Sequence, residues 1–186
     1  MPDEFKWGFK AGCEQIAKDT RFELNLAVAV PLDACRLAQH LDIPVMPITA
    51  LSEFGAHQRH LDVLLNAGRG LSAFTVVRGT YRAIFYNPAH PRTRRSKSLA
   101  HELSHVLLEH QPTIAIVDGL RNWNRVDESE ADWLAATLLV PRDGAFRWLR
   151  DGGTIGGGAQ HFCVSDELFQ WRARQTGIIR QLGLAR

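Results

Sequence analysis

The segment Ser98-Leu99-Ala100-His101-Glu102-Leu103-Ser104-His105 contains the pattern H-E-x-x-H and is the most informative part of this chain. Residues at i and i+4 of a helix lie on one face about a turn apart, so the imidazoles of His101 and His105 could both reach one zinc ion. Glu102 lies one residue further round the helix, where it could act on a water molecule as a general base. Apolar residues at helical spacing beside the histidines predict an amphipathic helix over residues 96–109.

A second helix, expected over 127–139, carries acidic residues in its first turns and could supply a third zinc ligand. Glu128 and Asp132 are spaced i, i+4. This spacing would let Glu128 bind zinc while Asp132 accepts the outer N–H of a ligating histidine and fixes its tautomer. Glu130 also precedes Ala131 and is the alternative ligand. We favour Glu128 because it shares a helix face with Asp132.

Simpler interpretations of both segments exist. The histidines could lie on a solvated helix face that happens to contain the motif. The acids could be ordinary first-turn residues, which the helix dipole favours whether or not a metal is near.

The rest of the chain predicts a mixture of helices and a few strands. Helices are expected over 4–24, 32–41, 56–66 and 143–149, and an extended, edge-like strand over 42–48, where two prolines limit pairing. The β-branched and aromatic runs 72–77 and 81–86, separated by Arg78-Gly79-Thr80, predict a β-hairpin. The basic stretch 92–97 is expected to be a solvated loop before the motif helix, and 152–158 to be a glycine-rich flexible loop. Two short helical stretches are expected in the tail.

The composition is that of one compact domain. The chain has 186 residues, of which 45% are hydrophobic and 23% are charged, and its formal net charge of +2 gives no argument for nucleic-acid binding. Its 3 cysteines are an odd number without C-x-x-C spacing, which favours a reducing compartment over a disulfide framework. No apolar run approaches the ~20 residues of a membrane span, and the N-terminus lacks the apolar region of a secretory signal. We therefore expect a cytoplasmic protein without membrane association.

The two motif segments resemble the ImmA/IrrE-type metallopeptidases, which are gluzincin-like bacterial proteases. That family has an A-H-E-x-x-H helix followed by an E-x-x-A-[ND]-x-[FL]-A-x-x-L-L-x-P helix, which the segments 100–105 and 128–141 match. The segment 32–45 resembles the family's short helix and proline-flanked strand, and Val164-Ser165 to Arg172 resembles its closing helix.

The fold expected from these features is α+β: a zincin-like domain with a small mixed sheet, the H-E-x-x-H helix, a glutamate-bearing second helix and a C-terminal helical tail. We expect a single domain over 1–186, with a core at about 25–150, the glycine-rich loop at 152–158 and the helical tail at 159–186. The resemblance implies that His101, His105 and Glu128 bind Zn²⁺ and that Glu102 is the catalytic base.

The expected function is zinc-dependent hydrolysis of a peptide bond in a protein. The resemblance implies that the substrate is a transcriptional repressor or antitoxin-like regulator, such as a helix-turn-helix repressor encoded nearby, cut to switch gene expression. The alternative is a non-catalytic module that binds such a repressor or DNA, with a structural metal or none. Direct nucleic-acid binding is not expected, since no basic recognition face is evident.

Two details of the proposed reaction remain open at this point. The strand at residues 80–86 could receive an extended peptide by β-addition. The donor to the oxyanion has several candidates: Tyr81, Tyr86, His161 and Arg172. The remaining histidines, His110 among them, are expected to be surface or cap residues.

Overall fold

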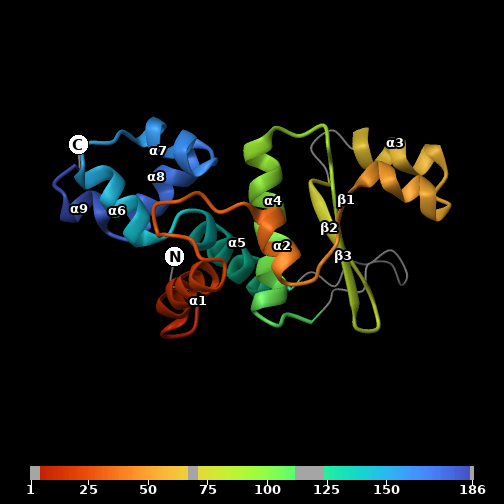
Figure 1. The fold of residues 1–186 in the computed structure, drawn as a ribbon, viewed down its shortest axis with the longest axis horizontal. Coiled ribbons are helices and arrows are strands. Elements are labelled where there is room, and N and C mark those ends of the chain that lie inside the picture. The colour runs from red at the N-terminus through yellow and green to blue at the C-terminus, as the bar shows by residue number, and fades with distance from the viewer. Residues whose placement is uncertain (1–4, 67–70, 112–123, 185–186) are drawn as a thin grey trace.

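A small mixed sheet and two long helices form the centre of the computed structural model, which describes residues 5–66, 71–111 and 124–184 (Figure 1). The strands are β1 (Val45–Pro47), β2 (Ala73–Arg78) and β3 (Tyr81–Tyr86), in the order β1-β3-β2. β3 pairs in parallel with β1 and antiparallel with β2, so the hairpin and the proline-flanked strand are confirmed. The described helices are α1 (Phe9–Glu23), α2 (Ala34–His40), α3 (Gln58–Asn66), α4 (Arg92–Leu107), α5 (Arg125–Leu139), α6 (Arg142–Arg150), α7 (Ile155–Phe162), α8 (Asp166–Gln175) and α9 (Ile178–Gln181), with a 3-10 helix, η1, at Ile48–Phe54.

The two faces of the sheet are covered by different helices. Phe74 of β2 stacks on Phe85 of β3, with ring centroids 5.5 Å apart, and this face packs against η1 and α3. Thr75 and its cross-strand partner Ile84 point to the opposite face, where Ile84 is buried against the apolar side of α4. Figure 1 shows the sheet lying between α4 on one side and α3 on the other. The alternation of side chains along β2 therefore directs Thr75 toward the motif helix.

Two apolar clusters meet along α5. Trp133, Leu134 and Leu138 of α5 belong to the cluster that contains α1, α2 and the inner face of α4. Ala135 and Leu139 belong to a second cluster, formed with the C-terminal helices α6 to α9. The core therefore extends beyond the expected limits of about 25–150, because α1 before it and α7 to α9 after it supply buried residues.

α1 is fixed to the rest of the molecule by buried polar contacts as well as by apolar packing. Arg172 of α8 is 1% exposed and donates from Nη2 to Glu14 Oε1 at 2.5 Å and from Nε to the Val140 carbonyl at 3.1 Å. Glu14 Oε2 also accepts from the backbone N–H of Arg142, at 3.2 Å. Beside it, burial raises the pKa of the Cys13 thiol to about 12, and all 3 cysteines are free thiols.

The expected loop over 152–158 is wrong for its second half. Thr154 caps α7, its side chain accepting from the Gly157 N–H, and the helix then runs through Gly156, Gly157 and Gly158. A Cβ at Gly158 would lie 2.4 Å from the Phe169 ring, so glycine is needed here to let α7 approach α8. The glycines serve close helix packing, and glycine composition alone does not separate this role from flexibility.

The basic stretch 92–97 was also expected to be a loop, and it is instead the first part of α4. Pro91 stands at the N-cap of this helix, where its missing N–H removes no intrahelical hydrogen bond. Arginine and lysine have good helix propensity, so the charge run is compatible with the helix that follows it.

Candidate metal centre

The metal-binding candidates converge where α4 faces the beginning of α5. His101 and His105 are one turn apart on α4, and Asn124 caps α5 by accepting from the Val126 N–H. The first turns of α5 therefore begin close to the histidines, with their acidic residues. The side chains of His101, His105 and Glu128 are 19%, 24% and 26% exposed, so all three are largely enclosed.

Three side chains present ligand atoms to one point. The two histidine Nε2 atoms lie 3.1 Å apart, Glu128 Oε2 lies 3.3 Å from His101 Nε2, and Glu128 Oε1 lies 3.7 Å from His105 Nε2. Ligands bound tetrahedrally at 2.0–2.1 Å are ~3.3 Å from one another, so this spacing suits a zinc ion. The chemistry of the donors agrees, since two imidazole nitrogens and a carboxylate form a set that zinc uses. The residues present therefore fit zinc.

Asp132 lies behind His101. Its Oδ1 is 3.1 Å from His101 Nδ1 and 3.3 Å from Lys97 Nζ. Burial opposes the charged forms of both His101 and Asp132, but their mutual hydrogen bond and the surrounding charges outweigh it. The pKa of His101 is raised by Asp132, Glu102 and Glu128, and that of Asp132 is lowered by His101 and Lys97. The carboxylate is thus placed to hold a proton on Nδ1, which leaves Nε2 of the same ring to face Glu128.

A residue of the sheet forms a hydrogen bond with Glu102. The Thr75 hydroxyl donates to Glu102 Oε2 at 2.6 Å, which joins the middle of β2 to the motif helix. The strand beside Glu102 is therefore β2. β3 was expected to receive substrate, but it is the middle strand: β2 pairs along its whole length, and β1 pairs with Ile84 to Tyr86. In the described part of the chain, β2 pairs with β3 alone.

The sequence interpretation missed the contact between His110 and His105. Its side chain is 8% exposed rather than on the surface, and its Nδ1 lies 2.9 Å from His105 Nδ1. Its Nε2 lies 3.2 Å from Glu130 Oε2, so Glu130 faces His110 while Glu128 faces the two motif histidines. Burial, together with the charges of His101 and His110, lowers the pKa of His105 to about 4. Nothing in the sequence indicated this contact, because His110 lies outside the motif.

Two of the candidate oxyanion donors are committed to other contacts. Arg172 is buried against Glu14 and Val140, and His161 contacts the Ala29 carbonyl at 2.6 Å through Nε2. Tyr86 lies beneath Arg95, whose guanidinium is 5.8 Å from the ring centroid, and Tyr81 is 82% exposed at the start of β3.

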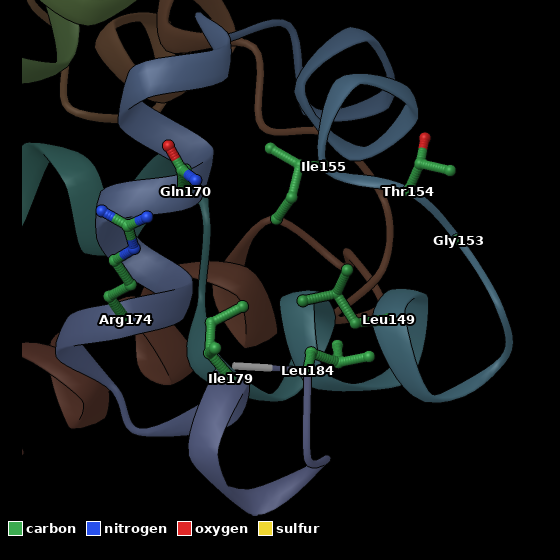
Figure 2. Close-up of a pocket in the computed structure, with 8 residues that line it drawn as sticks. All are labelled: Leu149, Gly153, Thr154, Ile155, Gln170, Arg174, Ile179 and Leu184. Carbon is green, nitrogen blue, oxygen red and sulfur yellow. The ribbon is translucent and has the colours of Figure 1, made fainter. Parts of the chain in front are cut away.

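A cavity of about 480 Å³ lies in another part of the molecule (Figure 2). Its wall is mostly apolar, with Gln170 and Arg174 of α8 on one side. The lining residues are Leu149, Gly153, Thr154, Ile155, Gln170, Arg174, Ile179 and Leu184. None of them belongs to α4 or α5, so this cavity is separate from the candidate metal centre.

Two histidines and a carboxylate gathered beside a further glutamate form the kind of site that metallopeptidases use. The chain belongs to the peptidase M78 family: the family model, described as an IrrE N-terminal-like domain, matches residues 51–175. This match covers about two thirds of the chain, includes both α4 and α5, and confirms the resemblance to ImmA/IrrE-type proteins. A comparison with curated proteins finds no match. Among the described residues, none of the helices combines the length and apolar character that a bilayer span requires.

Proposed function

We propose that this protein is a zinc-dependent endopeptidase with His101, His105 and Glu128 as metal ligands and Glu102 as general base. The observation that carries the proposal is the convergence of two Nε2 atoms and one carboxylate, with separations of 3.1 to 3.7 Å, on the helix that also carries Glu102. Membership of a peptidase family supports the same reaction class.

The roles of the side chains follow from their contacts. Zinc at this site would supply a Lewis acid that polarises the scissile carbonyl and makes water more acidic. Glu102 takes the proton from the attacking water and passes it to the leaving amine. Thr75 orients the Glu102 carboxylate through the 2.6 Å hydrogen bond to Oε2. Asp132 orients His101 by accepting a hydrogen bond from its Nδ1–H.

The substrate is a protein segment that adds to β2 in an extended conformation. The Thr75 contact supports this placement because it brings the middle of β2 to the general base. Strand addition supplies backbone hydrogen bonds without requiring a particular side chain, which suits an endopeptidase. From the resemblance to ImmA/IrrE-type proteins, the substrate class is a transcriptional repressor or antitoxin-like regulator in the cytoplasm, cut to change gene expression.

Metal analysis of purified variants tests the centre. With free zinc buffered at a micromolar level, we expect one zinc per chain in the wild type, in Glu102→Gln and in Glu130→Ala, and none in Glu128→Ala. Retention of zinc by Glu128→Ala together with its loss from Glu130→Ala would reassign the third ligand.

Cleavage of a repressor encoded beside this gene tests the activity. The wild type should cut it, and Glu102→Gln should be slower by at least ~100-fold, since general bases contribute on that scale. If the zinc-free protein is folded and equally active, the chain is not a zinc enzyme. If a zinc-loaded wild type binds the repressor without cutting it, the non-catalytic alternative holds.

A further inference from the structure

We propose that His110 and Glu130 form a hydrogen-bonded relay that fixes the tautomer and ring orientation of His105. His110 and Glu130 are then positioning residues: neither touches the substrate, and both act through His105. The inference rests on the proposed function in that His105 is taken to bind zinc through Nε2. It adds a second supported ligand to the centre, since His101 is already held by Asp132.

The relay is a continuous line of contacts from α4 to α5. His105 Nδ1 lies 2.9 Å from His110 Nδ1, and His110 Nε2 lies 3.2 Å from Glu130 Oε2. The side chains of His110 and Glu130 are 8% and 15% exposed, so water competes little for either contact. Hydrogen bonds in such surroundings hold a ring orientation more firmly than exposed ones do.

The end of α4 is folded in a way that returns His110 to His105. Glu109 has a left-handed backbone, with φ of 55°, and its N–H donates to the Val106 carbonyl at 3.1 Å. The His110 N–H donates to the His105 carbonyl at 3.0 Å. This pair of hydrogen bonds is a Schellman motif, which closes a helix and reverses the chain over its last turn. The backbone therefore sets His110 beside His105 independently of the side-chain contact.

The proton positions along this line can run in only one direction once His105 uses Nε2 as a ligand. Its Nδ1 must then carry the ring proton and donate a hydrogen bond to His110 Nδ1, which must be unprotonated. A neutral His110 consequently carries its own proton on Nε2, and this N–H faces the carboxylate of Glu130. Every donor meets an acceptor, and the carboxylate at the end fixes the direction of the whole line.

By the same argument, the relay excludes a second cation site at His110. Ligand atoms of His110, Asp127 and Glu130 lie within 4.8 Å of one another, a spacing that could hold an ion. Binding there would need a bare Nε2 on His110, and its proton would move to Nδ1, which would then oppose the proton of His105 Nδ1. A neutral His110 therefore cannot serve both sites. Since the relay needs His110 and Glu130 but not Asp127, Asp127 provides a matched control.

Zinc affinity, measured by competition with a chelator on the full chain, tests the relay without a substrate. His110→Leu should weaken zinc binding by roughly 10- to 100-fold, the usual effect of losing the partner of a ligating histidine. His110→Gln should restore most of the affinity, because its amide can accept from His105 and donate to Glu130. Glu130→Leu should weaken binding like His110→Leu, and Asp127→Asn should bind zinc as the wild type does. Circular dichroism and melting temperature check that each variant is folded.

Long-range ¹H–¹⁵N spectra of the zinc-loaded wild type give a readout that needs no variant. We expect His110 as the Nε2–H tautomer and His105 as the Nδ1–H tautomer. Tight zinc binding by folded His110→Leu, or His110 as the Nδ1–H tautomer, would overturn the relay while leaving the zinc enzyme intact. A second zinc that Asp127→Asn loses would overturn it in favour of a two-ion site. Failure of the wild type to bind zinc would instead refute the proposed function, and the relay with it.

Discussion

Thr75 joins the proposed chemistry to the sheet. Its hydroxyl donates a hydrogen bond to the Glu102 carboxylate at 2.6 Å, although the two residues are 27 positions apart in sequence. Threonine in a strand is ordinary on propensity grounds, so nothing in the sequence separates this residue from any other β-branched residue in the hairpin.

Replacing Thr75 with valine tests that contact. Thr75→Val keeps the branched shape and removes the donor, so we expect kcat for peptide cleavage to fall by about tenfold, corresponding to ~1.4 kcal/mol. Zinc content should not change, because Thr75 contacts the base and no proposed ligand. Thr75→Ser, which keeps the hydroxyl, should retain most of the activity. Equal kcat values for the wild type and Thr75→Val would remove Thr75 from the mechanism.

Local spacing explains which parts of the candidate site could be predicted from sequence. His101 and His105 lie together because an i, i+4 pair on a helix has no other option. Thr75 and His110 reach the site through a strand register and a helix-ending turn, neither of which has a residue signature here. The left-handed position of this turn is usually a glycine, which would mark it in a sequence, but here it is Glu109. Glu128 and Asp132 were predicted beside the histidines because their helix also carries a motif, whereas no motif indicated the contacts of Thr75 and His110.

The close contact of α7 with α8 shows the same limit at the level of an element. The sequence G-G-T-I-G-G-G has the composition of a linker, but the last three of these glycines lie in a helix. These glycines differ from those of a linker because a neighbouring helix packs on them. Phe169 of α8 lies against Gly158, although a turn and part of α8 separate the two residues in sequence. A helix whose glycines are required by a neighbour can be recognised only when the neighbour is placed.

A pair of alanine substitutions tests this packing. Gly158→Ala should destabilise the protein by about 1–3 kcal/mol, because its Cβ would meet the Phe169 ring at 2.4 Å and force α7 away from α8. Gly156→Ala is the matched control. Its Cβ would meet only Asp166 Oδ2, at 3.7 Å, so the better helix propensity of alanine should stabilise the fold by up to ~1 kcal/mol. Urea denaturation measures both, and equal effects of the two would contradict the packing argument.

Across the whole molecule, Glu14 links segments that are distant in the chain. It accepts from Arg172 in α8 and from the backbone of Arg142 at the start of α6, and it lies in α1. The N-terminal helix is therefore fastened to the C-terminal helices, and the two apolar clusters on either side of α5 are held in one arrangement.

Breaking this link should have a large effect on stability. Glu14→Leu leaves the 1% exposed guanidinium of Arg172 without its carboxylate, and we expect a loss of about 3–5 kcal/mol in the free energy of unfolding. The double variant with Arg172→Met should recover much of that loss, because an apolar pair of similar volume leaves no buried charge. A urea double-mutant cycle measures the recovery, and additive effects of the two substitutions would contradict a direct link.

One end of α5 carries Glu128, and the rest of the helix is buried in both apolar clusters. An ion held at that end would therefore resist every opening that removes α5 from its neighbours. With zinc at about 100 times its Kd, the native state gains about 2.7 kcal/mol, so the slowest backbone amides of α5 should exchange with deuterium about 100-fold more slowly. Glu128→Ala should abolish this slowing. Amide protection in the buried part of α5, beyond its first turns, would then report on occupancy of the metal centre that Glu128 helps to form.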